Sequence, residues 1–258
     1  MRSRYRISVG GVHMDTLDDN LMILDISHSP MKRVIAESRA ANLNGIDYAD
    51  TPYLDKTTVT VTFELHIYDI AKRNAACQKV NEWAAAGGTL LSNDRSGQQL
   101  RDVVCERFAS IASARNWTDP LTVIFATTWN PHWRSGSLKT LALSGKTPKG
   151  TLKMDGNLGE TPVTVEATAK ANVTSFKITV GSTNVELKGL TMKNGSVLKI
   201  DHQRGRYLRV RVDDKSVMSL LQPNSSDMLT AKCGENVAVS ISANGKVAAT
   251  ISARGEWL

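Results

Sequence analysis

The stretch "TTVTVTFELHIY", Thr57–Tyr68, alternates without a break between apolar side chains and threonine, glutamate, histidine or tyrosine. Strict alternation is typical of a β-strand with one buried face, because successive side chains point to opposite sides. A typical strand has about five or six residues, whereas this run would span roughly 40 Å at ~3.3 Å per residue. The sequence therefore predicts one unusually long strand over residues 57–68. The question is what its polar face contacts.

The residues that follow predict a single helix. Asp69 can accept a hydrogen bond at a helix N-terminus. Apolar side chains then recur at helical spacing, at Ile70, Cys77, Val80 and Trp83. Gly87-Gly88 is the usual C-terminal stop. We expect a helix over about residues 69–86 that covers the apolar face of the long strand.

The rest of the first half reads as strands and loops. "RYRISVGGVHM" and "LMILDIS" predict two short strands. Residues 32–56 are polar, small and turn-rich and predict a long loop, a type of segment that is usually functional or mobile. Residues 89–108 fit either a helix or a strand. We favour a strand, because the strand–turn–strand pattern that follows, with its turn at Asn116–Pro120, needs a hairpin partner upstream.

The second half predicts a β-sandwich. Short alternating runs such as "TPVTVEATAK", "SFKITVG", "RYLRVRVDD" and "NVAVSISANG" follow one another, with Gly and Asn at the turns. Evenly spaced short strands without a helical segment are typical of two packed sheets. In "SANGKV", Asn244-Gly245 predicts a hairpin with a type I′ turn, because both central residues of that turn have positive φ.

Composition divides the chain at the same place. Residues 1–134 carry 15 basic and 15 acidic side chains, whereas residues 135–258 carry 17 basic and 10 acidic ones. Three of the fourteen aromatic residues lie after residue 134. This break, together with "WNPHWRSGS", predicts two domains, residues 1–136 and 137–258. The N-terminus lacks the apolar segment of a signal peptide and no apolar run approaches about 20 residues, so we expect a soluble protein that folds in a cytoplasm and contacts no membrane.

No constellation for catalysis, cofactor binding or metal binding emerges. "GKTPKG" lacks the order of a phosphate loop, and no pair of carboxylates can be nominated for glycoside hydrolysis. The three cysteines are far apart and never in CxxC spacing, so they predict small buried side chains. We expect neither an enzyme nor a cofactor.

The densest basic stretch is "KIDHQRGRYLRVRV", in which Tyr207, Arg209 and Arg211 share one face of a strand. One interpretation is a surface that faces a partner, such as nucleic acid, lipid headgroups or an acidic protein. The other is a solvated outer face whose arginines keep the strand soluble. Nucleic-acid binding generally needs several exposed aromatic side chains among the basic ones, and Tyr207 is alone here.

The order of these features resembles the distal tail proteins of long-tailed (siphovirus-type) bacteriophages and prophages, over nearly the whole chain. The resemblance rests on an ordered set of segments, namely "RYRISVGGVHM", "DKTTVTVTFELHIYD", "VNEWAAAGGTL", "WTDPLTVIFATTWNPHW" and the closing "CGENVAVSISANGKVAATISARGEWL". "SVLKID" also fits a sandwich element of that family, although Ser196-Val197 stands where an acidic residue is common. No single motif is specific.

The resemblance implies a mainly β fold: an N-terminal tube- or belt-type β-barrel domain with one α-helix, and a C-terminal galectin-like β-sandwich. It implies a structural protein of the virion tail tip, assembled in the bacterial host cytoplasm. Six copies would form a ring that joins the tail tube protein to the baseplate hub and the adhesion apparatus, and receptor-binding or fibre proteins would attach to the sandwich. DNA would only pass through the channel of the ring.

In such a ring the polar face of the long strand would line the channel, with Thr58, Thr60, Thr62, Glu64 and His66 facing inward. A channel wall without basic side chains suits the passage of DNA. Each phosphate that a basic side chain neutralises would add salt-dependent binding affinity and slow the DNA. A heterologous contact that closes produces a ring, and we expect the loop 32–56 to reach the neighbouring subunit. The residues expected there are Arg39, Asn42, Asn44, Tyr48 and Tyr53.

Three other functions stay open. A tail-tube or hub protein would share the tube-type fold, but a tube protein usually lacks so large a sandwich and a hub needs a much longer chain. A carbohydrate-binding, lectin-like module would need an exposed aromatic platform, which three aromatics in the second half scarcely supply. A cell-wall-degrading enzyme lacks the carboxylate pair.

Overall fold

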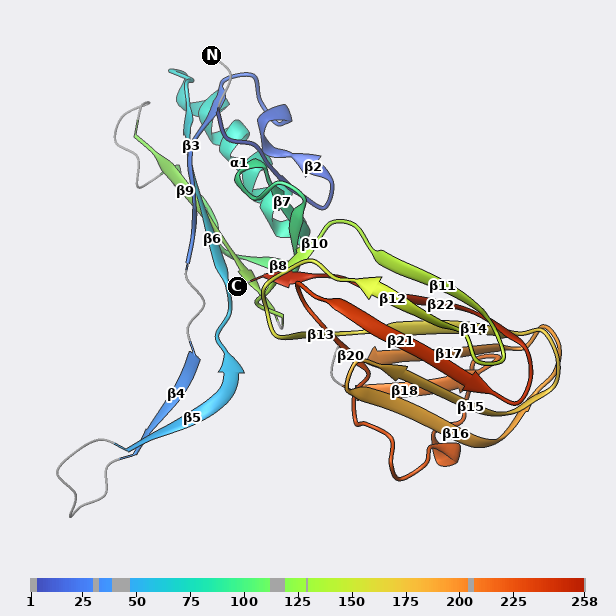
Figure 1. Cartoon of the computed structure of the whole chain (residues 1–258). Helices are drawn as coiled ribbons and strands as arrows, with labels where there is room; N and C mark the ends of the chain where they lie inside the picture. Colours follow the sequence, from blue (N-terminus) through green and yellow to red (C-terminus); the bar gives the residue numbers. More distant parts are fainter. Residues whose placement is uncertain are drawn as a thin grey trace. The chain divides into compact units, whose positions relative to one another are not determined.

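The computed structural model describes residues 4–29, 33–38, 47–111, 119–128, 130–203 and 207–257, and gives only the backbone of residues 33–38, 47–54 and 203. The chain packs as two compact units, Met1–Trp133 and Arg134–Leu258. In the described residues the fold is mainly β with one α-helix, as the sequence predicts (Figure 1).

Unit 1 is built on an antiparallel sheet with the strand order β2-β1-β7-β8-β9-β6-β3. Its strands are β1 (Ile7–Val9), β2 (Val12–His13), β3 (Leu21–His28), β6 (Thr58–Leu65), β7 (Gly88–Ser92), β8 (Gln98–Arg107) and β9 (Leu121–Thr127). The strands β7 and β8 settle the ambiguous stretch after the helix in favour of a hairpin. The turn expected at Asn116–Pro120 falls mostly outside the described residues.

This sheet does not close into a barrel within the described part of the chain, although the resemblance to distal tail proteins implies one. β2 and β3 are the two ends of the strand order. β2 has only two residues before the chain turns into the short 3-10 helix η1 (Met14–Thr16), so it offers almost no backbone ladder for closure.

The strand of the opening stretch is shorter than predicted. β6 ends at Leu65, opposite Leu21 of β3, so it spans eight residues, or roughly 26 Å at ~3.3 Å per residue. Beyond it the His66 N–H donates to the Asn20 carbonyl and the Ile67 N–H donates to the Leu65 carbonyl. These bonds turn the backbone out of the sheet, although the sequence continues to alternate between polar and apolar residues over residues 66–68. Within β6 the alternation is as predicted, since Val59, Val61, Phe63 and Leu65 are buried.

The helix α1 (Ile70–Ala86) begins and ends where the sequence predicts. Asp69 Oδ1 accepts a hydrogen bond from the Lys72 N–H at 3.0 Å, and this bond lowers the pKa of Asp69. Gly87 ends the helix with a φ of 59°. A Cβ there would lie 2.7 Å from the Val103 carbonyl oxygen, so the stop requires glycine.

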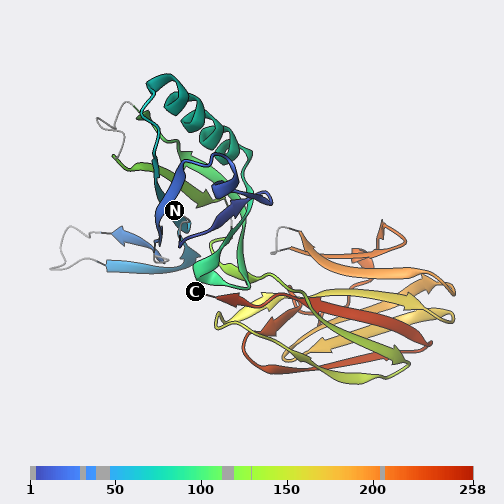
Figure 2. The ribbon, with the colours of Figure 1, turned by 90° about the horizontal axis from the view of Figure 1, so that it is seen from above.

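Residues 33–38 and 47–54 form two paired strands (Figure 2), whereas the sequence predicts a loop over residues 32–56. β4 (Arg33–Ser38) pairs antiparallel with β5 (Asp47–Leu54), from Ser38 opposite Asp47 to Arg33 opposite Leu54, with one shift in register (Figure 1). The prediction was wrong because it relied on apolar alternation. Pairing by backbone hydrogen bonds does not need a buried face, and these strands show no clean alternation.

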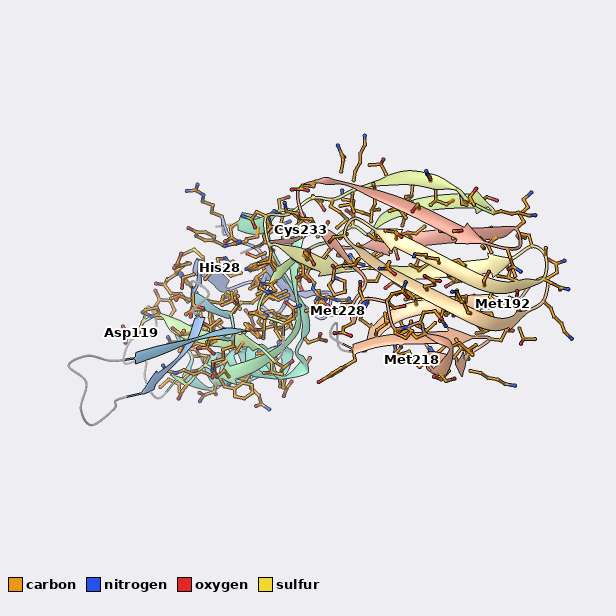
Figure 3. All side chains as sticks on the ribbon, turned by 60° about the horizontal axis from the view of Figure 1, so that its bottom comes forward. His28, Asp119, Met192, Met218, Met228 and Cys233 are labelled. Atoms are coloured by element: carbon orange, nitrogen blue, oxygen red, sulfur yellow. The ribbon has the colours of Figure 1, made fainter. Side chains whose placement is uncertain are left out.

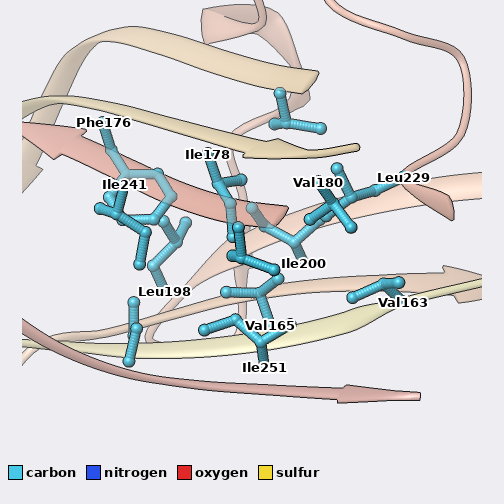
Figure 4. Close-up of a cluster of buried hydrophobic side chains, with 14 of the residues drawn as sticks. Val163, Val165, Phe176, Ile178, Val180, Leu198, Ile200, Leu229, Ile241 and Ile251 are labelled. Carbon is cyan, nitrogen blue, oxygen red and sulfur yellow. The ribbon is translucent and has the colours of Figure 1, made fainter. Parts of the chain in front are cut away.

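Unit 2 is the predicted two-sheet sandwich. One sheet has the order β11-β22-β14-β17-β18-β19 and the other β12-β21-β15-β16. The first sheet contains β11 (Lys139–Gly145), β14 (Thr164–Ala169), β17 (Val197–Gln203), β18 (Tyr207–Val212), β19 (Lys215–Ser216) and β22 (Val247–Ala253). The second contains β12 (Lys149–Lys153), β15 (Val173–Val180), β16 (Thr183–Met192) and β21 (Asn236–Ala243). Buried side chains from both sheets meet in one apolar core that includes Phe176 and Ile251 (Figure 4).

The hairpin predicted at Asn244-Gly245 is wrong. β21 and β22 lie in different sheets, so the chain crosses the sandwich there. Gly245 lies outside the positive-φ region, and its backbone packs so closely on Asn172 that a Cβ would lie 2.3 Å from that carbonyl oxygen. Within unit 2, a turn with two positive φ values occurs instead at Asp213-Asp214 (47° and 64°), which connects β18 to β19.

The first residues of unit 2 are held by its last strand, β23 (Glu256–Trp257), which pairs with β10 (Trp133–Ser135). The Ser135 N–H donates to the Gly255 carbonyl at 2.8 Å, and Arg254 Nη1 donates to the carbonyls of Ser135 and Gly136. Arg134 Nε lies 2.7 Å from Glu256 Oε1. A small hairpin of β13 (Glu160–Pro162) and β20 (Thr230–Lys232) completes the unit.

Candidate channel-facing and partner-facing surfaces

The exposed side of β6 carries the predicted channel residues. Thr58, Thr60, Thr62 and Glu64 are each partly exposed, while the side chains between them are buried. We call this surface the threonine face. His66 lies beyond the end of the strand, but its Nε2 is 2.8 Å from Glu64 Oε2, so it stays close to the face.

Neighbouring strands widen the threonine face. Thr62 lies between Asp25 of β3 and Thr122 of β9, and Thr60 lies between Ser27 and Ile124 in the same way. Directly opposed residues in a sheet share a face. The threonine face therefore also includes the four neighbours of Thr60 and Thr62, namely Asp25, Ser27, Thr122 and Ile124. Asp25 and Ser27 are not among the residues predicted for this face. A bulge between Ile23 and Asp25 breaks the alternation of β3, so its exposed face cannot be read from the pattern.

The threonine face carries charges of both signs. Its hydroxyls are neutral, and the charged side chains that the β3–β6 register places there, Asp25 and Glu64, are carboxylates. On the other side of β6, the β8–β9 register places the exposed Arg107 opposite Ile124. A surface of hydroxyls with a few charges of mixed sign offers hydrogen bonds to water and has no concentration of positive charge that would attract a polyanion.

The residues expected to reach a neighbouring subunit remain predictions. Arg39, Asn42 and Asn44 lie outside the described residues. Tyr48 and Tyr53 lie in β5, of which only the backbone is described. The backbone shows that they belong to a paired hairpin.

The basic strand is not a free cationic surface. Arg209 Nε and Arg211 Nη2 each lie 2.7 Å from an oxygen of Asp201, which sits on the adjacent strand β17. Burial opposes ionisation of Asp201, but the hydrogen bonds from Arg209 and Arg211 outweigh it, so the pKa of Asp201 lies below its ordinary value. The arrangement favours the solvated-face interpretation, with Tyr207, 68% exposed, at the end of the strand.

The outer face of the six-stranded sheet has a shallow hollow of about 330 Å³. Apart from Leu143, the side chains that line it are small or polar, and Glu166 is its charged group. An aromatic ring is the usual stacking platform for a sugar, and none lines this hollow, so it lends no support to a lectin-like site.

Within the described ranges, no three His, Cys, Asp or Glu side chains gather closely enough to hold a metal ion. In the same part of the chain, α1 is neither long nor apolar enough to span a bilayer.

The comparisons with known proteins give a match at the level of structure. No model of a protein family and no curated protein matches the sequence. The crystal structure of the SPP1 Dit (gp 19.1) protein, described as a paradigm of the hub adsorption apparatus in phages that infect Gram-positive bacteria, is similar with a TM-score of 0.72. The match covers 98% of this chain and 99% of that chain at 13% sequence identity.

Two structures of the phage P2 baseplate in its activated conformation, with Ca and with Sr, give TM-scores of 0.47 and 0.46 at 7% identity, and cover 97% of each chain. Similarity at that level is too weak to indicate a common fold. The SPP1 Dit match confirms, at the level of fold, the resemblance to distal tail proteins that the sequence predicts.

Proposed function

We propose that this chain is a structural component of a phage tail tip, a distal tail protein without enzymatic activity. The observation that carries the proposal is the agreement of fold with the SPP1 Dit protein over nearly the full length of both chains. A local match would be compatible with many functions, because one domain fold serves many roles. Agreement across both units is more restrictive, since the pairing of a helix-bearing sheet with a sandwich must also be shared.

In the proposed assembly six copies form a ring through unit 1. A heterologous contact closes into a ring when the rotation that relates one subunit to the next is a whole fraction of a full turn. The threonine face lines the central channel, and its partly exposed hydroxyls and carboxylates let DNA pass without binding it. The strand is shorter than the sequence suggested, so each subunit contributes roughly 26 Å of wall along β6 at ~3.3 Å per residue.

The partners follow from the position of such a ring in the virion. One side joins the tail tube protein, and the other joins the baseplate hub. The hairpin β4–β5 reaches the neighbouring subunit, and unit 2 carries the adhesion apparatus, such as receptor-binding or fibre proteins.

The full chain tests the ring directly. Light scattering at micromolar concentration is expected to give about six times the mass of the chain, and negative-stain class averages should show a ring with a central hole. A mass that stays monomeric over this concentration range contradicts the proposal.

A labelling experiment tests the orientation of the threonine face. In the purified assembly, Thr60→Cys should react with a small maleimide and react far more slowly with a bulky polymer-linked maleimide, because the channel excludes the polymer. Thr164→Cys, on an exposed position of β14 in unit 2, is the matched control and should react with both. Equal reaction of Thr60→Cys with both reagents places the face on the outside and overturns the channel.

A further inference from the structure

Four connections between strands lie at one end of the sandwich in unit 2. They join β11 to β12, β14 to β15, β16 to β17, and β21 to β22, and each crosses from one sheet to the other. Met192, which is marked in Figure 3, ends β16 at this end. The connections carry, in or directly beside them, five exposed lysines. We call these residues the lysine end: Lys146, Lys149, Lys170, Lys193 and Lys246.

The pairing register brings the connections together. In the first sheet, Val247 at the start of β22 lies opposite Gly145 at the end of β11 and opposite Ala169 at the end of β14. In the second sheet, Val173 at the start of β15 lies opposite Met192 at the end of β16. Four lysines of the lysine end are the next residue along the chain from one of these positions. They therefore gather where the strands of both sheets end.

Backbone hydrogen bonds hold the connections against one another. The Lys170 N–H donates to the Lys246 carbonyl at 2.8 Å. The Ala243 N–H donates to the Lys146 carbonyl, also at 2.8 Å. The connection that carries Lys193 is bound to the end of β14 by two further backbone bonds. The backbone of the lysine end is thus fixed in advance, and only the lysine side chains need to be ordered on binding.

The positive charges of the lysine end are not balanced locally. In the described part of unit 2, the lysines that form ion pairs are four others, namely Lys139, Lys177, Lys188 and Lys232. The four connections themselves contain neither Asp nor Glu. Because the backbones of Lys170 and Lys246 are bonded to each other, two like charges stand side by side, which destabilises a sheet. A bound anion would relieve this repulsion.

The carboxylates at this end of the sandwich lie to one side, in the turn between β18 and β19. Asp213 Oδ1 accepts a hydrogen bond from the Val197 N–H at 2.8 Å, and this bond lowers the pKa of Asp213. Asp214 lies 4.0 Å from Arg211. In the strand order, β17 separates this turn from β14, β22 and β11. The lysine end is therefore a surface of one sign.

The chemistry of the lysine end favours an anionic polymer over a protein as its partner. Among the described residues, none of the exposed large apolar side chains lies on these connections. Protein interfaces, in contrast, have an apolar or aromatic core and few lysines. Lysine binds a phosphate as a point charge, without the fixed bidentate geometry of arginine. The connections also lack the aromatic platform on which nucleic-acid bases stack.

We propose that the lysine end binds a flexible, phosphate-bearing polymer of the bacterial cell surface through charge alone. That the polymer belongs to a cell surface rests on the proposed function, which places this chain at the tail tip. The binding itself does not require the ring, because all five lysines belong to one chain. In a ring, six copies would present six such surfaces, and their linkage would add avidity.

Salt-dependent binding of the full chain tests the proposal, with poly(glycerol phosphate) as the polymer. For a flexible strand, log K falls with log salt by roughly 0.7 per neutralised phosphate, so five lysines predict a slope of roughly −3.5. Lys170→Gln combined with Lys246→Gln should lower the slope to roughly −2 and weaken binding about tenfold or more at about 50 mM salt. Lys170→Arg combined with Lys246→Arg retains both charges and should bind like the wild type.

The matched control is Lys79→Gln combined with Lys153→Gln. It removes the same net charge at two exposed positions, one on α1 and one at the end of β12 away from Lys149. Weakening of the control to the same extent would contradict a localised site. Weakening of the arginine variant to the same extent as the glutamine variant would contradict recognition by charge.

Two further measurements complete the test. The glutamine variant of Lys170 and Lys246 should unfold at the same temperature as the wild type or slightly higher, because repulsion is relieved. A lower temperature would give these lysines a structural role instead. Duplex DNA with the same number of phosphates is the competing polymer, and binding tenfold tighter than to poly(glycerol phosphate) would overturn the assignment to a surface polymer. A chain that binds as expected but stays monomeric contradicts the ring and still supports the lysine end.

Discussion

The indole ring of Trp83 meets the phenyl ring of Phe125 edge to face, with centroids 5.5 Å apart. Trp83 lies on α1 and Phe125 on β9, next to β6, so this pair fixes the helix on the apolar face of the sheet. The Trp83 Nε1–H also donates to the Val12 carbonyl at 2.9 Å. One buried side chain therefore joins the helix, the central strands and the β1–β2 hairpin.

Replacing Trp83 with a smaller side chain is expected to weaken both contacts, with Phe125 and with Val12. Trp83→Phe retains a ring but leaves the Val12 carbonyl without its donor, which should cost about 1 kcal/mol of the free energy of unfolding. Trp83→Ala should cost about 3–5 kcal/mol, because it also leaves a cavity. Urea unfolding followed by circular dichroism measures both. Ile70→Ala, 74% exposed on the same helix, is the control, and an equal loss in that variant would contradict the assigned role.

Gly245→Ala tests the crossing between the two sheets. The new Cβ would lie 2.3 Å from the Asn172 carbonyl oxygen, and that backbone atom cannot move without shifting the start of β15. We expect a loss of about 1–3 kcal/mol or more in thermal unfolding. Gly159→Ala is the matched control, because its Cβ would meet no atom within 4 Å. Equal stability of the two variants would mean that the crossing is not tightly packed.

Glu186 makes part of the stability dependent on pH. Hydrogen bonds from Lys177, Asn224 and Lys188 lower the pKa of Glu186 from 4.5 to about 2. A lowered carboxyl pKa contributes stability that is fully present above pH 4.5 and is lost as the pH falls toward about 2. In unfolding measured across this range, wild-type protein should be more stable than Glu186→Gln near neutral pH, and the difference should narrow below pH 4.5. If the difference in stability between wild type and Glu186→Gln stayed constant as the pH fell, the contribution of Glu186 would not depend on its negative charge.

Asp201→Asn should turn the basic strand into a cation-rich surface. The substitution removes the charge that both Arg209 and Arg211 contact at 2.7 Å. We expect the variant to elute from heparin at higher salt than the wild type, because two guanidinium groups become available to anions. Asp227→Asn changes the net charge equally at an exposed position and serves as the control. An equal increase in the elution salt concentration of both variants would show that net charge alone explains the change, and would contradict the assigned role of Asp201.

The predictions that held depend on neighbouring residues in the chain. The cap at Asp69 and the stop at Gly87 act within one turn of the helix, so α1 could be delimited from the sequence. The alternation in β6 reports burial of every second side chain, so the threonine face could be found as well. Its members Asp25 and Ser27 could not, because the bulge in β3 depends on how that strand pairs with β6.

The predictions that failed concern where a chain segment goes next. Asn244-Gly245 has the composition of a tight turn, but the strands on either side bury their apolar faces in opposite sheets, and this demand overrides the turn preference. Residues 66–68 continue the alternation of β6, but the backbone bonds of His66 and Ile67 take them out of the sheet. The partner of Arg209 and Arg211 could not be predicted either. Asp201 lies on a different strand, and only the pairing register of the two strands places it beside these arginines.

The sequence by itself determined the mainly β character, the one helix with its ends, the sandwich in the second half and which side of β6 is exposed. Those properties follow from local hydrogen-bonding preferences and from the period of apolar side chains. Only the tertiary structure decided the open sheet of unit 1, the pairing of β4 with β5, and Asp201 as the partner of Arg209 and Arg211. These depend on contacts between residues far apart in the chain, whose free energy has no counterpart in any short stretch of sequence.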